Sequence, residues 1–185
     1  MTFSRIFSGE NYKGEFRYLD TQKKYEIARA VILYSLSIAI FLAGYITTGT
    51  KKNLLTIVAV FGVLPASKAL VSVIMFLRYK SFKERIDCEG ILNAYDMVFT
   101  SEKVNYSISH LCVSEGCVIG YTEDPKFDEN KFKDHVTSIL AVENLKNITV
   151  KVFTDKKTYL NRISSLKPSA GTDENVMKIL RQIVL

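Results

Sequence analysis

Three residues with soft metal-ligating side chains lie close together in the sequence: His110, Cys112 and Cys117. Imidazole nitrogen and thiolate sulfur are donors that zinc prefers, and a Cys–His pair can also form a catalytic nucleophile. Zinc needs four protein ligands, or three and a water molecule. The sequence has no second pair of the Cys-x-x-Cys type, and no Walker, GxGxxG, HExxH or GxSxG motif. We therefore predict that these side chains pack in a core, and we predict no metal, cofactor or catalytic residue.

One charged residue, Lys68, interrupts a long apolar stretch three positions after Pro65. A charge at such a depth in a membrane is costly and usually faces protein or water. Because proline leaves a backbone carbonyl free one turn earlier, Lys68, Pro65 and Ser72 are candidates for an intramembrane ion, proton or lipid-headgroup site. The alternative, which we favour, is that Lys68 extends along its aliphatic stem to the membrane surface.

Two apolar stretches position these residues, at about residues 30–48 and 54–77. Each is long enough to cross a hydrocarbon core of roughly 30 Å, so the sequence predicts a two-helix transmembrane hairpin over residues 30–77. The short turn-like connection makes the two helices antiparallel neighbours. The alternative is a pair of buried core helices in a soluble protein, but the remaining chain is too short to cover two such uniformly apolar helices.

The distribution of charge predicts the orientation of this hairpin. Residues 1–78 carry ten Lys/Arg and four Asp/Glu, whereas residues 79–185 carry fifteen of each. Basic residues flank both ends of the hairpin, and its loop carries only Lys51 and Lys52. The positive-inside rule therefore predicts a multi-pass protein of the cell membrane with both termini in the cytoplasm, comprising an N-terminal segment 1–29 and a domain 79–185. The domain has no net charge, which excludes the usual electrostatic basis for binding nucleic acid.

Small residues recur every four positions on both apolar stretches. This spacing lets helix backbones approach closely, either within the hairpin, which we favour, or between copies of the chain. The helix-packing candidates are Ser35, Ala39, Ala43, Gly62 and Ala66.

After Leu77 the apolar periodicity predicts an α+β domain with a mixed sheet flanked by helices, in the order αβββαβαα. Asp128 and Asp155 are expected to cap helices. The expected elements are a helix at 79–94, strands at 95–100, 104–113 and 117–121, a helix at 128–145, a strand at 148–153, a short helix after 155 and a last helix from 172.

Two other features have both structural and functional interpretations. Glu123, Asp124, Asp128 and Glu129 form an acidic cluster that could bind a cation. We favour the simpler interpretation that acids at a helix start complement the helix dipole. The apolar C-terminus at residues 183–185 must be buried, by default in its own domain and otherwise against a partner or the membrane surface.

The order of elements over about residues 80–166 resembles the core of restriction-endonuclease-like folds, including nuclease-related domains of some membrane-associated bacterial proteins. Such nucleases need an acid on the second strand and an acid-x-Lys pair on the third, to hold a divalent metal. The third strand here, VIGYT at 118–122, supplies neither, and Asp96 is the only acid within the first strands. The resemblance therefore implies the fold without the nuclease chemistry.

The whole chain is also similar to a family of small, uncharacterised, two-span bacterial membrane proteins. The segments that carry this similarity are FRYLDTQKKY at 16–25, KNLLTIVAV at 52–60 and GYTEDP at 120–125. The similarity implies a bacterial membrane protein and carries over no activity.

Three functions are compatible with this sequence. The one we favour is a membrane-anchored, non-enzymatic interaction or assembly module, with the lipid bilayer and either a second copy or another membrane protein as partners. The second is a degenerate nuclease-like, membrane-tethered hydrolase, which requires acids and a lysine to converge at one end of the sheet. The third is a small channel or transporter accessory that uses Lys68, which requires several copies around a wet pore.

Overall fold

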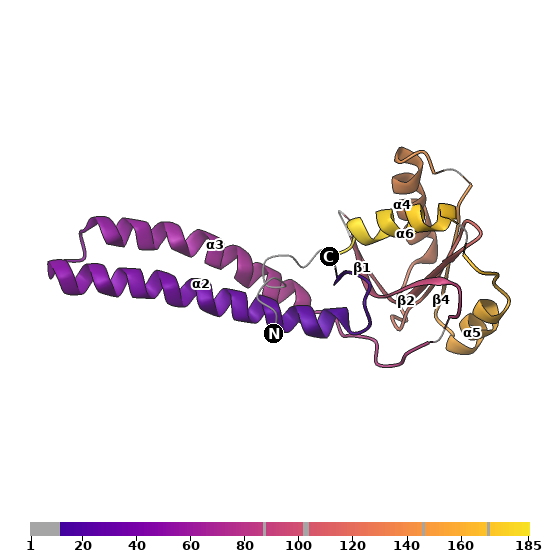
Figure 1. The fold of residues 1–185 in the computed structure, drawn as a ribbon, viewed down its shortest axis with the longest axis horizontal. Coiled ribbons are helices and arrows are strands. Elements are labelled where there is room, and N and C mark those ends of the chain that lie inside the picture. The colour runs from indigo at the N-terminus through magenta and orange to yellow at the C-terminus, as the bar shows by residue number, and fades with distance from the viewer. Residues whose placement is uncertain (1–11, 87, 102–103, 146, 170) are drawn as a thin grey trace. The chain divides into compact units, whose positions relative to one another are not determined.

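A computed structural model describes residues 12–86, 88–101, 104–145, 147–169 and 171–185 of the chain. The chain forms two compact units. One contains Leu19–Lys80, and the other combines the described part of Glu10–Tyr18 with Ser81–Leu185. Figure 1 shows the helices and strands of both.

The first unit is a hairpin of two long helices, α2 (Tyr18–Thr48) and α3 (Leu54–Leu77). Asn53 caps α3, because its side-chain oxygen accepts a hydrogen bond from the amide of Thr56 at 2.8 Å. Both helices are long and apolar enough to cross a membrane. The helix α2 also begins well before residue 30, so it includes much of the segment that precedes the predicted span.

The hairpin carries its large apolar side chains on the outside. Ile46, Phe61 and Leu64 are 78%, 65% and 66% exposed, whereas Ala66 and Ala69 of α3 are buried. Only 17% of the apolar window of each helix is buried. This distribution is the reverse of the one found in water-soluble proteins, where large apolar side chains fill the interior.

The second unit is an α+β domain built on a four-stranded mixed sheet, as predicted. The strands lie in the order β1-β2-β3-β4; β2 pairs antiparallel with β1 and β3, and β4 pairs parallel with β3. The parallel pair requires a crossover, which the helix α4 provides. The elements are β1 (Leu92–Thr100), β2 (Asn105–Ser114), β3 (Cys117–Tyr121), α4 (Glu129–Val142), β4 (Thr149–Phe153), α5 (Lys156–Ser164) and α6 (Gly171–Gln182).

The predicted helix at 79–94 is wrong, since no described residue between α3 and β1 is helical. Side chains of β1 bind the backbone of this segment instead. The amide of Phe82 donates to Asp96 Oδ1 at 2.7 Å, the amide of Ile86 donates to Tyr95 Oη at 3.1 Å, and Tyr95 Oη donates to the Ile86 carbonyl at 2.8 Å. Contacts between residues distant in sequence therefore override the local helix propensity. The described elements of the domain run βββαβαα, without the leading helix.

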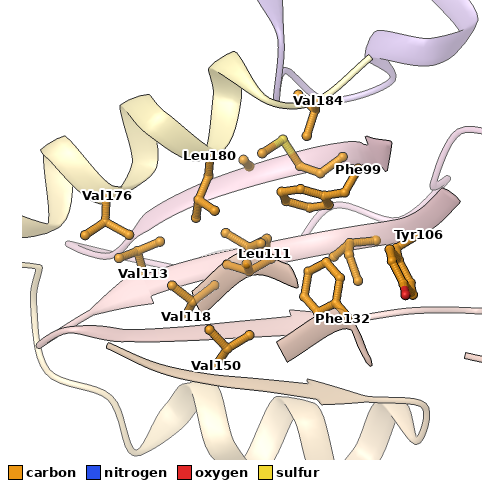
Figure 2. Packing of buried hydrophobic residues seen from close by; sticks show 14 of the residues in the cluster. Phe99, Tyr106, Leu111, Val113, Val118, Phe132, Val150, Val176, Leu180 and Val184 are labelled. Carbon is orange, nitrogen blue, oxygen red and sulfur yellow. The ribbon is translucent and has the colours of Figure 1, made fainter. Parts of the chain in front are cut away.

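Helices cover both faces of the sheet. Figure 2 shows the first face, where Phe132 of α4 and Leu180 of α6 pack on Phe99, Leu111 and the neighbouring strand residues. Phe99 and Phe132 meet edge to face at 5.1 Å between ring centroids. On the second face, Tyr159 and Ile163 of α5 pack with side chains from the segment before β1.

The alternation of side chains between the two faces shifts near the middle of β1. Asp96 has φ of 55°, in the left-handed region that few non-glycine residues adopt. As a result Ala94 and Met97, three positions apart, both pack in the first core, and so do Ile108 and Leu111 on β2. The polar or polarisable residues that face the second side of the sheet include Tyr95, His110 and Cys112.

Segments from both ends of the chain join β1. The amide of Tyr95 donates to the Gly14 carbonyl at 2.9 Å, and the amide of Leu185 donates to the Val98 carbonyl at 2.9 Å. Val184 is buried in the first core. The apolar C-terminus is therefore buried in its own domain, as expected, and residues 12–18 belong to the same unit although they precede the hairpin.

Candidate functional site

A buried group of polar and sulfur-containing side chains lies between β2 and α5. His110 and Cys112, two positions apart on β2, face the same side of the sheet, as the strand period predicts. Tyr159 comes from α5, whose first turn is capped by Asp155 through the amides of Lys157 and Thr158. Besides His110 and Cys112, the group has another soft metal-ligating side chain, that of Cys88 in the segment before β1.

The donor atoms of Cys88, His110 and Cys112 all lie within 4.8 Å of one another, and we call these residues the three-donor cluster. Cys88 Sγ is 3.6 Å from Cys112 Sγ, and Cys112 Sγ is 3.9 Å from His110 Nδ1. The hydroxyl of Tyr159 lies 2.6 Å from His110 Nδ1 and 3.8 Å from Cys112 Sγ. The arrangement brings two thiols and an imidazole to one point.

His110 and Cys112 are uncharged at neutral pH. Burial lowers the pKa of His110 to about 4, so the imidazole is neutral. The hydrogen bond with Cys88 and then burial raise the pKa of Cys112 well above its ordinary value, and burial likewise raises the pKa of Tyr159. A thiol in this state is not an activated nucleophile, because the thiolate is the reactive form. For Cys112, ligand binding or packing is therefore favoured over catalysis as a free thiol.

His110 also has an unsatisfied polar atom. It is fully buried, and its Nε2 has no hydrogen-bond partner among the described residues. The Tyr95 ring lies beside the imidazole, with 4.5 Å between the ring centroids. Since most buried polar atoms in proteins are hydrogen-bonded, this histidine is costly as an element of packing alone.

The cluster can be reached from the surface at Cys88, which is half-buried. Cys88 lines a groove of about 650 Å³ together with Tyr95, Ile86 and residues of the segment before α2. The groove gives a solute access to the Cys88 thiol, whereas Cys112 lies behind it and is fully buried.

The sequence prediction named Cys117 as the third soft donor, and the structure places it elsewhere. Cys117 lies opposite Ser114 at the turn between β2 and β3, outside the three-donor cluster. Cys88 was missed because it is 24 positions from Cys112 and lies in the segment predicted to be a helix. No local spacing indicates this contact, since only the docking of the segment on the sheet produces it.

The intramembrane candidates all lie on α3. Lys68 and Pro65 are exposed, and Ser72 is half-buried. The Ser72 hydroxyl donates a hydrogen bond to the Lys68 carbonyl at 3.3 Å. A role for the Lys68 side chain in ion, proton or headgroup binding remains a prediction.

The helix-packing candidates divide between the two helices. On α3, Ala66 is fully buried and Gly62 is half-buried; a Cβ on Gly62 would lie 2.7 Å from Ser37 Oγ. On α2, the predicted residues lie on the exposed side, and the buried small residues are Ala30, Ser37 and Gly44. The contact within the hairpin therefore uses another stripe of α2, and contact between copies through the exposed stripe stays a prediction. The exposed α2 residues are Ser35, Ala39 and Ala43.

Most of the acidic residues considered as cation ligands bind backbone amides. Asp128 caps α4 through the amide of Lys131 at 3.2 Å, as predicted. Asp124 accepts from the amide of Lys126 at 2.9 Å, and Glu129 from that of Val152 at 3.3 Å. Asp96 is buried on the edge strand β1, two strands away from β3, which Glu123 follows. This arrangement does not favour a nuclease-like centre.

No protein-family model, curated protein or solved structure matches this chain. Two apolar helices and a mixed sheet with helices are consistent with the two resemblances drawn from the sequence. Membership of either family stays a prediction.

Proposed function

We propose that this protein is a membrane-anchored, non-enzymatic interaction or assembly module, whose hairpin spans the cell membrane and whose α+β domain lies on the cytoplasmic side. The supporting observation is the apolar outer surface of the hairpin, formed by the exposed large apolar side chains of α2 and α3. Among the described residues after Lys80, the only exposed large apolar side chains are Val104, Val142 and Leu160. A continuous apolar surface of this kind is unstable in water and matches lipid.

Contacts within the second unit support a topology in which both ends of the hairpin lie on one side of the membrane. Gly14, before α2, accepts a hydrogen bond from Tyr95, after α3, and Phe16 meets the Tyr95 ring edge to face at 5.2 Å between centroids. A hairpin that crosses the bilayer twice satisfies this condition. The basic flanks favour the cytoplasm as that side.

The non-enzymatic part of the proposal rests on how the domain uses its buried polar groups. Asp173 accepts hydrogen bonds from the amides of Glu115 and Gly116, both at 3.0 Å. Thr122 donates to the Ser107 carbonyl at 2.7 Å. These groups stabilise turns and strand ends, and His110 and Cys112 are uncharged at neutral pH, which supports a role other than catalysis by these two side chains.

Cysteine labelling in intact cells tests the topology. Thr50→Cys places a thiol in the exposed hairpin loop, and Glu123→Cys places one at an exposed position of the domain. We expect a membrane-impermeant maleimide to label the loop variant in intact cells and the domain variant only after lysis, with the unsubstituted protein as the background. Labelling of the domain variant in intact cells would show the opposite orientation. Recovery of the chain in the soluble fraction would show that the hairpin is not a membrane anchor.

Cross-linking tests assembly between copies of the chain. Ala39 is exposed on α2 and Ala66 is buried against α2, so the two form a matched pair. We expect Ala39→Cys to form disulfide-linked dimers in oxidised native membranes and Ala66→Cys to form none. If neither variant forms dimers, assembly of identical copies through this face of α2 is excluded.

A further inference from the structure

We propose that Cys88, His110 and Cys112 bind a zinc ion, with a water molecule as the fourth ligand. Such a site goes beyond the proposed anchoring role, since neither the membrane topology nor assembly requires it. It lies on the second face of the sheet and connects the segment before β1 to β2. Its donor atoms come from two parts of the chain that the sequence does not place together.

The spacing of the donor atoms fits a single metal ion. With metal–sulfur bonds of about 2.3 Å and metal–nitrogen bonds of about 2.0–2.1 Å in a tetrahedral site, two sulfurs lie about 3.8 Å apart and a sulfur and a nitrogen about 3.6 Å. The observed distances are 3.6 Å between the two sulfurs and 3.9 Å between Cys112 Sγ and His110 Nδ1. Small movements of the side chains are enough to bring all three donors to bonding distance.

The charge of the site also fits its surroundings. Binding of Zn²⁺ by two cysteines releases two thiol protons to solvent, and the neutral histidine contributes a lone pair without releasing a proton. The two thiolates neutralise the charge of the metal, so the filled site has no net charge. This matters because the neighbours are apolar or aromatic, including Phe82, Ile119 and Tyr121.

Tyr159 can remain in place when the ion binds. Its hydroxyl lies 2.6 Å from His110 Nδ1, the atom that would bind the metal. The same hydroxyl lies 3.4 Å from the His110 carbonyl oxygen, to which it can donate instead. The fourth ligand, water, can enter from the groove that Cys88 lines. The site therefore has three protein ligands, a fourth position for water and an entry path.

A disulfide between Cys88 and Cys112 is the competing explanation for the two thiols. Their sulfurs are 3.6 Å apart, compared with about 2.05 Å in a disulfide. A disulfide also needs no third donor, whereas the imidazole of His110 lies within 4.8 Å of both sulfurs. The histidine is therefore the observation that favours a metal over an oxidised pair.

The test is zinc binding by the full chain, purified in detergent under reducing conditions and stripped with a chelator. We expect equilibrium dialysis to show one zinc ion per chain in the unsubstituted protein. The variants Cys88→Ser and Cys112→Ala are each expected to bind zinc more than about 100-fold more weakly. A loss of this size exceeds the one that follows from removing a residue that only hydrogen-bonds to a metal ligand. Cys88 is half-buried in a non-helical segment, so its substitution should disturb the fold little. Cys117→Ser is the matched control and should bind like the unsubstituted protein, since Cys117 lies outside the three-donor cluster.

Cobalt reports the ligand type independently. Co²⁺ in the unsubstituted protein should give thiolate-to-metal charge-transfer absorption, which Cys88→Ser weakens and Cys117→Ser leaves unchanged. Circular dichroism of each variant shows whether loss of binding arises from loss of folding. If Cys112→Ala does not fold, the test depends on Cys88→Ser alone. The proposal is overturned if the reduced protein binds no zinc, if folded Cys88→Ser binds it as tightly as the unsubstituted chain, or if the chain is isolated with a Cys88–Cys112 disulfide that zinc does not prevent.

Discussion

The hairpin and the sheet domain use the same kinds of apolar residue in opposite ways. In the hairpin, alanine and glycine form much of the contact between α2 and α3, and leucine, isoleucine and phenylalanine cover the outside. In the domain, large side chains such as Phe132 and Leu180 are fully buried, and charged residues cover the helices. This difference is the one expected if the hairpin faces lipid, as proposed above, because lipid removes the need to bury large apolar side chains.

Serine hydroxyls of the two units include examples that differ in the reach of their hydrogen bonds. In the hairpin, serine and threonine hydroxyls donate to carbonyls one turn back, as Ser37 does to Leu33 at 3.0 Å and Ser67 to Val63 at 2.9 Å. In the domain, Ser169 donates to the carbonyl of Val113, 56 positions away, at 2.6 Å. These two hairpin hydroxyls bind locally, whereas Ser169 connects distant segments of the domain, as the Lys23 side chain does in the first unit by donating to the Tyr79 carbonyl.

The largest expected effect contrasts a buried and an exposed phenylalanine. Phe132→Ala empties a space on the first face of the sheet, where the ring contacts Phe99, Tyr106 and Phe127, and should cost about 3–5 kcal/mol of domain stability. Phe61→Ala, at an exposed site of α3, should leave the denaturation midpoint of the domain unchanged. Equal loss of domain stability in both variants would show that the two units do not differ in this way.

The next prediction concerns the outer surface of the hairpin. Leu64→Arg places a charge near the middle of α3 and should oppose membrane insertion by roughly 3 kcal/mol. The measurement is the fraction of the chain that remains in membranes after alkaline extraction. Leu160→Arg, on the exposed side of α5, is the control and should leave that fraction unchanged. A hairpin that tolerated Leu64→Arg fully would not be facing lipid at this position.

A smaller effect is expected where a polar contact connects distant segments. Asp173→Ala leaves the amides of Glu115 and Gly116 without their acceptor and should cost about 2–3 kcal/mol. Chemical denaturation measures the loss, and Glu174→Ala, an exposed neighbour, should change little. Asp173→Asn retains one acceptor oxygen, so the domain should be more stable with this variant than with Asp173→Ala. If the two variants are equally unstable, the negative charge of Asp173 is what stabilises the turn.

The smallest effect separates the two stripes of small residues. Ala66→Leu inserts a large side chain into the contact between α2 and α3 and should cost about 1–2 kcal/mol. Ala39→Leu, on the exposed side of α2, should leave the thermal stability of the monomer in detergent unchanged. If Ala39→Leu lowers the thermal stability more than Ala66→Leu does, the exposed stripe of α2 contacts another molecule, such as a second copy of the chain.

Features that depend on neighbouring residues were predicted correctly, and features that depend on distant contacts were not. The apolar runs of α2 and α3, the caps at Asp128 and Asp155, and the strand at residues 117–121 all match the structure, because each depends on neighbouring residues. The helix expected at 79–94 was wrong, and no local pattern indicated that Cys88 lies beside His110 and Cys112. Both concern one segment, whose backbone and thiol are held by β1 and β2.

By itself the sequence determined two long apolar helices, the kind of each element from the first strand onward and the facing of His110 and Cys112 on one side of a strand. These features follow from the length of apolar runs, from the periods of helix and strand, and from capping side chains, all of which act over a few residues. Only the tertiary structure decided which stripe of α2 meets α3, and that Cys88 joins His110 and Cys112. The physical reason is that helix rotation and segment docking are set by complementary packing between distant surfaces, which no local pattern encodes.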